Sequence, residues 1–144
     1  MSIQNEALGI ARAWLGTPYH HQASKKHVGC DCLGLVRGIW RELYDTEPEI
    51  APPYTADWSE ASREETLWDA ARRNLIEIDW DEVVPGDVIL FRMAQSHPAK
   101  HVGVLSGSDR FIHAYSNRAV TENALSRWWE AKRVACFTWP DRHP

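Results

Sequence analysis

The chain has 144 residues, a usual length for one domain with its own core, so we expect a single domain over residues 1–144. Its net charge of −4 argues against a nucleic-acid partner, because such a partner would need a basic face. No apolar run approaches the roughly 18 residues that a membrane span needs, so none is expected.

The first half of the sequence is predicted to be mostly helical. Apolar residues recur at helical spacing from Ile3 to Leu15, and Gly16 and Pro18 then end the run. A second helix is predicted from about Cys32, where an apolar stripe begins. Residues 47–62 are expected to form an irregular surface connection. A third helix is predicted to start at Ser62, because residues 62–65 match a capping box.

After Asn74 the apolar period changes from that of a helix to two, which is typical of strands. Strands are predicted within residues 85–91, 101–105, 110–115 and 133–139, with a short helical piece at residues 125–131. Turn residues at positions 106–109 join the second and third of these strands. Helices followed by an antiparallel sheet indicate the α+β class.

Two cysteines, Cys30 and Cys32, stand one residue apart where the second helix begins. Structural zinc sites use cysteines two to four residues apart together with a second cluster, and the only later cysteine is Cys136. Histidines could contribute further ligands, so zinc stays open as the weaker alternative; they are His20, His21 and His27. A disulfide between such near neighbours would be strained, and three cysteines are too few for a disulfide framework.

The third alternative is that one of the two cysteines is a nucleophile. Cys32 stands at the helix start after Asp31, an N-cap type, and unpaired N–H groups there favour a thiolate. Cys30 lies in the preceding loop and lacks this placement. Gly34 and Gly38 cost about 1 kcal/mol each inside a helix, so we expect the helix to pack closely against the sheet there. The competing interpretation is that Cys32 is a small buried core residue.

A thiol nucleophile needs a histidine base, and the base needs an orienting group. His101 opens one predicted strand and His113 lies in the next. If the turn is centred on Gly107, the two histidines lie directly opposite each other, with Cβ atoms about 4.5–5.5 Å apart. The alternative is two unrelated histidines on an edge strand. The other histidines are expected to be exposed or on the substrate side; they are His20, His21, His27, His97 and His143.

Four motifs, "TPYHHQ…GCDCLGLV", "PGDVILF", "HVGVL" and "FIHAY", occur in an order that resembles the NlpC/p60-type family of bacterial cell-wall cysteine peptidases. The resemblance implies a papain-like α+β fold with N-terminal helices packed on an antiparallel sheet. It makes Cys32 the nucleophile, His101 the general base and His113 the third polar residue. It also implies that Asp31 contacts the free amine of the substrate peptide and that Tyr19 lies beside the thiol.

Enzymes of this family typically cut the γ-D-glutamyl–diaminopimelate link of peptidoglycan stem peptides through an acyl-enzyme, which implies no metal and no cofactor. Leu33 departs from the family pattern, because its position is commonly serine. The loop from His20 to Val28 is a feature of this chain, and neither its role nor those of Cys30 and Cys136 follows from the resemblance.

The N-terminal residues have neither a basic nor an apolar signal region, so we expect synthesis in the cytoplasm without a secretory signal. A stand-alone domain of this size resembles the subgroup encoded among phage-tail and gene-transfer-agent genes, which implies tail proteins as partners and action in the cell wall.

Two rival functions remain, a thiol amidase or acyltransferase of the same fold and a non-catalytic tail-tip assembly protein. The order of Cys32 before His101 favours the peptidase over the first, because permuted relatives place the histidine before the cysteine. The complete triad disfavours the second, since an assembly protein would need none of its groups.

Overall fold

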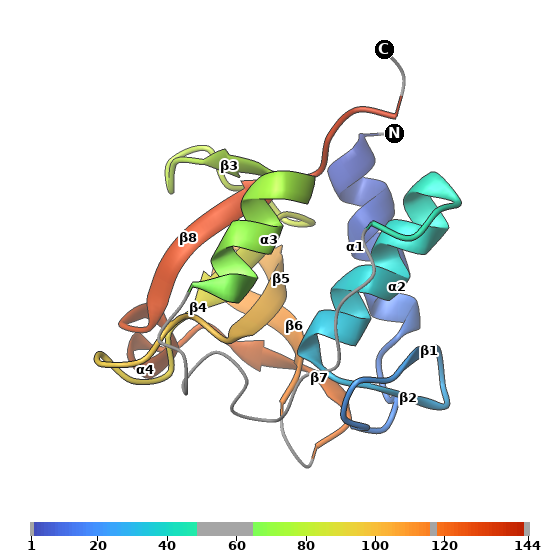
Figure 1. Ribbon diagram of the computed structural model, residues 1–144, viewed down its shortest axis with the longest axis horizontal. Coiled ribbons are helices and arrows are strands. Elements are labelled where there is room, and N and C mark those ends of the chain that lie inside the picture. Colours follow the sequence, from blue (N-terminus) through green and yellow to red (C-terminus); the bar gives the residue numbers. More distant parts are fainter. Residues whose placement is uncertain (1, 49–64, 116–117, 143–144) are drawn as a thin grey trace.

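The computed structural model describes residues 2–48, 65–115 and 118–142 (Figure 1). The helices are α1 (Ile3–Ala13), α2 (Cys32–Tyr44), α3 (Thr66–Asn74) and α4 (Arg127–Glu130). The strands are β1 (Ser24–Lys25), β2 (Gly29–Cys30), β3 (Ile76–Ile78), β4 (Val88–Phe91), β5 (His101–Gly107), β6 (Arg110–Ala114), β7 (Val120–Ala124) and β8 (Arg133–Thr138). The α+β prediction is confirmed. In this part of the chain, no helix has both the length and the apolar character needed to cross a bilayer.

Six strands form one antiparallel sheet in the order β3-β8-β4-β5-β6-β7. Alternation along the strands separates two apolar faces. The first face packs against α1, α2 and α3, which Figure 1 shows on one side of the sheet; its strand residues include Val88, Leu90, Val102, Val104 and Ile112. The second face carries a smaller cluster of Ile89, Phe91, Leu105, Phe111 and Leu125, against which Trp129 of α4 packs. The strands β3 and β7 were not predicted.

The first two helices begin where the sequence predicts, because polar side chains cap them. The Ser2 hydroxyl accepts a hydrogen bond from the Asn5 N–H at 3.1 Å and starts α1. The Asp31 carboxylate accepts one from the Gly34 N–H at 2.7 Å and starts α2. The predicted helical piece near residue 125 is α4, which begins after Ser126.

The described part of α3 begins at Thr66, and the proposed capping residues 62–64 lie outside the described residues, as does most of the predicted surface connection. Glu65, which precedes the helix, does not cap it with its side chain. Its carboxylate instead accepts a hydrogen bond from the Ala99 N–H at 2.9 Å and pairs with Arg92 at 2.9 Å. Glu65 therefore ties the start of α3 to the loop that leads into β5.

The glycines of α2 do permit close packing, but the prediction that the sheet is their neighbour is wrong. A Cβ atom on Gly34 would lie 1.9 Å from the Ala23 carbonyl oxygen, and one on Gly38 would lie 2.1 Å from the Trp14 ring. Trp14 is the residue that ends α1. The glycines thus let α2 approach α1 and the loop before β1.

The predicted register of the β5–β6 hairpin is also wrong, by two residues. Val104 pairs with Ile112 and Leu105 pairs with Phe111, because the chain turns at residues 108 and 109 and a bulge follows at Ser106. Continuing this register places Gly103, not His101, opposite His113. Since side chains alternate with a period of two, a shift of two leaves every side chain on its predicted face. His101 and His113 therefore still share a face, as diagonal neighbours.

We predict opposite effects for alanine at two helical glycines. Gly38→Ala should lower the free energy of unfolding by about 1–3 kcal/mol, because the new methyl group overlaps the Trp14 ring. Gly9→Ala in α1 should raise it by up to about 1 kcal/mol, because nothing lies within 4 Å of the added carbon and alanine favours the helix. Urea denaturation of both variants measures the difference. Equal stabilities would contradict the packing of α2 against Trp14.

Candidate active site

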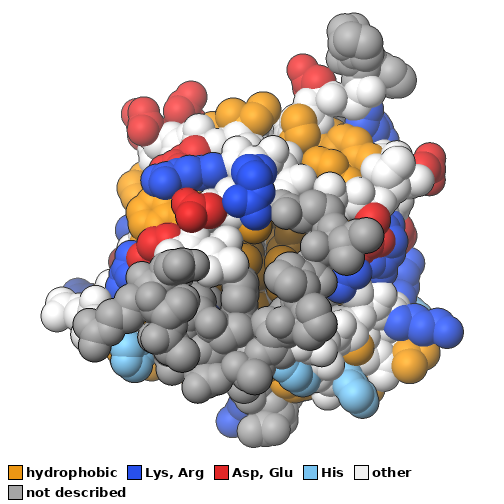
Figure 2. Space-filling view, viewed as in Figure 1, with side chains coloured by type: hydrophobic (Ala, Val, Ile, Leu, Met, Phe, Trp, Pro, Cys, Tyr) orange, Lys and Arg blue, Asp and Glu red, His pale blue; other side chains and the backbone are white. Residues whose placement is uncertain are grey.

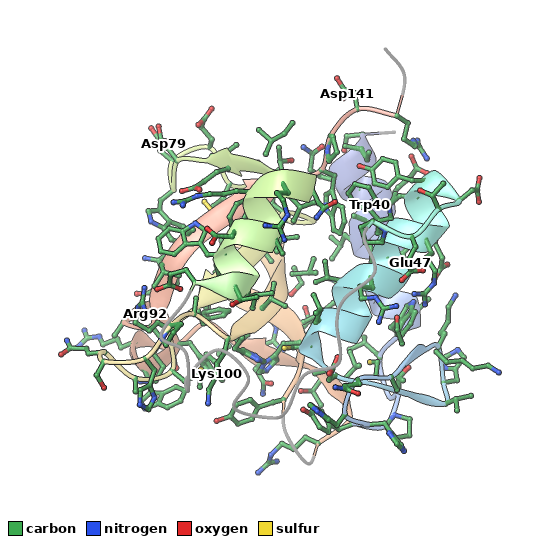
Figure 3. All side chains as sticks on the ribbon, viewed as in Figure 1. Trp40, Glu47, Asp79, Arg92, Lys100 and Asp141 are labelled. Atoms are coloured by element: carbon green, nitrogen blue, oxygen red, sulfur yellow. The ribbon has the colours of Figure 1, made fainter. Side chains whose placement is uncertain are left out.

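Cys32 is the first residue of α2, as predicted, and its thiol lies beside the start of β5. The Sγ atom donates to the carbonyl oxygen of Lys100 at 3.8 Å, and backbone N–H groups of Val102 and Leu33 hydrogen-bond to the sulfur. Lys100 directly precedes His101, and Figure 3 shows Lys100 at the same end of the molecule as the beginning of α2. The structure therefore brings the predicted nucleophile to the strand end that carries the predicted base.

The helix start does favour the thiolate, but burial outweighs this effect in the resting protein. Burial raises the pKa of the Cys32 thiol to about 12, and the negative charge of Asp31 adds to this increase. The N–H groups of Val102 and Leu33 oppose it but are outweighed. Cys32 therefore rests as a neutral thiol, and its proton has to pass to a base when the sulfur attacks.

His101 and His113 form a direct hydrogen bond between their rings. The Nε2 atom of His101 lies 2.8 Å from Nδ1 of His113, and only 1% of His113 is exposed. Gly103 makes this contact possible: a Cβ atom there would lie 3.2 Å from the His113 Cβ and 2.9 Å from the Phe111 ring. The two imidazole rings therefore contact each other, although His101 and His113 are diagonal neighbours and not the directly opposed pair that the sequence predicted.

A third side chain, Asn123, extends this pair and was not found from the sequence. Its amide oxygen lies 2.8 Å from Nε2 of His113 and accepts a second hydrogen bond from the Thr121 hydroxyl at 2.9 Å. Asn123 belongs to β7, a strand of low intrinsic β-propensity that forms through pairing with β6. The available sequence signal was the polar spacing of Thr121 and Asn123, which puts both side chains on one face of a strand.

Aromatic rings enclose the histidine pair on the second face of the sheet. Trp129 has its ring centroid 5.4 Å from that of His101 and 5.1 Å from that of His113, and Tyr115 lies 5.5 Å from His101. Burial lowers the pKa of His113 to about 4 and that of His101 well below its ordinary value. Both imidazoles are therefore neutral near pH 7, which leaves His101 able to accept a proton.

Of the two predicted substrate contacts, Asp31 directly precedes Cys32 in the chain, and Tyr19 forms a β-bridge with Cys30. Asp31 is 3% exposed, and its second carboxylate oxygen accepts a hydrogen bond from the Gln22 N–H at 2.8 Å. Burial raises the pKa of Tyr19 to about 12, and the negative charge of Asp31 adds a smaller contribution. Tyr19 is thus a neutral hydroxyl. The contact of either residue with substrate stays a prediction.

The other two cysteines are buried free thiols. Cys30 pairs with Ser24 in the small β1–β2 hairpin, and its pKa is raised to about 12 by burial. Cys136 in β8 donates to the Ile78 carbonyl oxygen at 3.2 Å. Among the described residues, the carboxylates, imidazoles and thiols that gather within ligating distance of one another are those of Asp79, Asp81 and Glu82. That group contains neither cysteine nor histidine, so the geometry does not support the zinc alternative.

An apolar pocket lies between α2, α3 and the first face of the sheet, and Figure 2 shows its hydrophobic floor. Leu33 and Val102, which follow Cys32 and His101 in the chain, both line it. Leu33, the departure from the family pattern, thus forms an apolar wall on the helix side. Because Val102 points to the face opposite His101, we treat this pocket as separate from the histidine pair.

Comparison with known proteins supports the sequence resemblance. The profile of the NlpC/P60 family matches residues 16–138. The chain is 26% identical over 129 residues to the probable endopeptidase NlpC of Escherichia coli (strain K12), covering 85% of this chain and 73% of that protein. It is 29% identical over 123 residues to the gamma-DL-glutamyl hydrolase of Bacillus subtilis (strain 168), covering 85% of this chain and 26% of that protein.

The fold agrees with solved structures of this kind. The crystal structure of the NlpC/p60 domain of the peptidoglycan hydrolase SagA superposes with a TM-score of 0.67 at 15% identity, covering 94% of this chain and 97% of that one. At this identity the likeness shows the fold alone, and it confirms the papain-like prediction.

We predict that Trp129 keeps the histidine pair neutral by excluding water. Trp129→Ala should raise the pKa of His113 from about 4 toward the ordinary value of 6.5, because exposure removes the penalty on the charged form. A pH titration of the His113 ring signals by NMR measures this shift. Trp128→Ala is the matched control, because Trp128 is 53% exposed and contacts the Trp129 ring. A His113 pKa that stays near 4 in Trp129→Ala would show that the strands alone bury the pair.

Proposed function

Since the chain belongs to the NlpC/P60 family of peptidoglycan endopeptidases, we propose that it is a cysteine peptidase acting on peptidoglycan stem peptides. Cys32 is the nucleophile, His101 the general base and His113 the residue that orients the base. The observation that carries the proposal is the 2.8 Å contact between two buried, neutral imidazoles, at the strand start where the Cys32 thiol lies. If the histidine pair had only a structural role, it would not need a thiol at the start of the same strand.

The proposed reaction begins with transfer of the Cys32 proton to His101 while the sulfur attacks the amide carbonyl carbon. His113 accepts a hydrogen bond from the other nitrogen of His101 and stabilises the imidazolium that forms. N–H groups at the start of α2 stabilise the negative charge on the tetrahedral oxygen. His101 then gives its proton to the leaving amine, which leaves an acyl group on Cys32.

The second half of the reaction releases the acyl group. His101 takes a proton from a water molecule, and the resulting hydroxide attacks the thioester carbon. The carbon–sulfur bond breaks, the free carboxylate departs, and the proton returns to Cys32. Every proton moves through one imidazole, so this sequence needs no metal ion and no organic cofactor.

The bond that we propose is the γ-D-glutamyl–diaminopimelate link. The Bacillus subtilis relative is named a gamma-DL-glutamyl hydrolase, which supports the γ-glutamyl part of this choice. Asp31 and Tyr19 are the proposed contacts on the substrate side, because Asp31 directly precedes the nucleophile and Tyr19 forms a β-bridge with Cys30. Asp31 would act there through its negative charge, which a free substrate amine would complement.

For the setting of the reaction we propose a phage-tail or gene-transfer-agent particle whose tail proteins hold the enzyme, made in the cytoplasm and carried to the cell wall. The support is the resemblance of a domain of this size to the subgroup encoded among tail genes. Immunodetection in purified particles tests it. Recovery in the tail fraction is expected, and recovery only in the soluble cell fraction would contradict this setting.

We predict that Cys32→Ala lowers kcat for stem-peptide hydrolysis by at least about a thousandfold, because the acyl-enzyme cannot form. The assay incubates a synthetic stem tetrapeptide or purified peptidoglycan with the protein and follows new diaminopimelate amines. Cys30→Ala is the control and should keep its activity, because Cys30 is a buried thiol of the β1–β2 hairpin.

Three outcomes would contradict the proposal. Activity that survives Cys32→Ala but is lost in Cys30→Ala would assign the nucleophile to the other cysteine. Loss of activity with EDTA would revive the zinc alternative. Transfer of the acyl group to an added amine in preference to water would identify an acyltransferase.

A further inference from the structure

We propose that Asn123 is a positioning residue that sets the proton arrangement of the histidine pair, so that Nδ1 of His101 is the nitrogen that takes the Cys32 proton. The inference rests on the proposed function only in naming His101 as the base. The arrangement of protons itself follows from the hydrogen bonds of β6 and β7.

The register of β6 and β7 places Asn123 within reach of His113. Thr121 pairs directly with His113, and Asn123 pairs with Phe111, so the side chains of all four residues lie on one face. Asn123 reaches diagonally to Nε2 of His113 at 2.8 Å. The Thr121 hydroxyl donates to the same amide oxygen at 2.9 Å, in the amide orientation that turns the oxygen toward the histidine.

An amide oxygen can only accept a hydrogen bond, so Nε2 of His113 carries the proton. A neutral imidazole has one N–H, and Nδ1 of His113 is therefore an acceptor. Nε2 of His101 lies 2.8 Å from that acceptor and has to donate to it. Nδ1 of His101 is then left unprotonated. The orientation of the Asn123 amide thus determines, through His113, which ring nitrogen of His101 is free to accept a proton.

Without Asn123, the hydrogen bond between the two histidines could run in the opposite direction. His113 would then donate from Nδ1 to Nε2 of His101, and Nδ1 of His101 would carry a proton. That form cannot accept the thiol proton at the same nitrogen. Because both directions satisfy the contact between the rings, the His101–His113 pair alone does not choose between them.

A neutral amide suits a buried pair that has to stay uncharged until attack. A carboxylate at this position would accept from Nε2 in the same way but would stabilise an imidazolium. Burial holds the pKa of His113 at about 4, whereas the hydrogen bond to Asn123 raises it only in part. Asn123 therefore directs the protons without charging the pair in the resting protein.

The first test reads the protons directly, in the absence of substrate. In the wild type, ¹⁵N NMR of the imidazole rings should show His113 protonated at Nε2 and His101 unprotonated at Nδ1. In Asn123→Ala, a substantial population of the reverse form should appear. In Asn123→Asp, the wild-type arrangement should persist while the His113 pKa rises. Asn123 is exposed, so these variants should fold.

The second test uses stem-peptide hydrolysis. Asn123→Ala should lower kcat by about tenfold with KM unchanged, the size of one lost hydrogen bond. Asn123→Asp should keep kcat at alkaline pH and move the acidic limb of the pH profile to higher pH, because the pair then binds a proton more tightly. Asn5→Asp, which adds the same charge on α1, is the matched control and should leave both the limb and kcat unchanged.

The two proposals fail in different ways. If the wild type does not cleave stem peptides but shows the predicted NMR pattern, the proposed function fails and the role of Asn123 in the proton arrangement stands. If the wild type is active and Asn123→Ala keeps both its NMR pattern and its kcat, the inference is overturned. Protonation of His113 at Nδ1 in the wild type would also overturn it.

Discussion

The buried carboxylate of Asp31 is the interaction on which the rest of the site depends. One oxygen caps α2 through Gly34 and the other holds the loop at Gln22, so the helix and the loop are joined at one residue. This join sets Cys32 at the helix start, two residues after Cys30, with which Tyr19 forms a β-bridge. Burial raises the pKa of the thiol and the same negative charge adds to the increase, so the group that positions the nucleophile also helps to keep it protonated at rest. Activation therefore has to come from the histidine side.

The base is built on the opposite side of the sheet from α1, α2 and α3. His101 and His113 lie among Phe91, Phe111 and Trp129, whereas α2 packs on the other face. The two halves meet where β5 begins, through the contact of the Cys32 sulfur with Lys100 and Val102. Because the two sides of the sheet pack separately, a helix cap can fix the thiol on one side while aromatic rings exclude water from the imidazoles on the other.

Local patterns predicted a large part of this arrangement, and the reasons are physical. The start of α2 was predictable because an aspartate cap acts within three residues. The shared face of His101 and His113 was predictable because strand alternation survives an even error in register. The register itself was not, since it depended on a bulge at Ser106. The neighbours of Gly34 and Gly38 were also beyond local pattern, because Ala23 and Trp14 meet α2 only through tertiary packing.

Asn123 and Trp129 show where reasoning from sequence ends. Neither follows a motif, and each acts through a strand or helix whose position is set by its neighbours. Trp129 contacts the two imidazole rings from a four-residue helix. Asn123 contacts His113 across the β6–β7 pair, although the residue directly opposite His113 is Thr121. The nucleophile and base are fixed by short motifs because each needs one specific chemical group at one specific place. The direction of the protons between them needs only an oxygen at the far end of the pair, so different side chains on β7 could supply it. That freedom explains why the residue that sets the proton arrangement is harder to recognise in a sequence than the base.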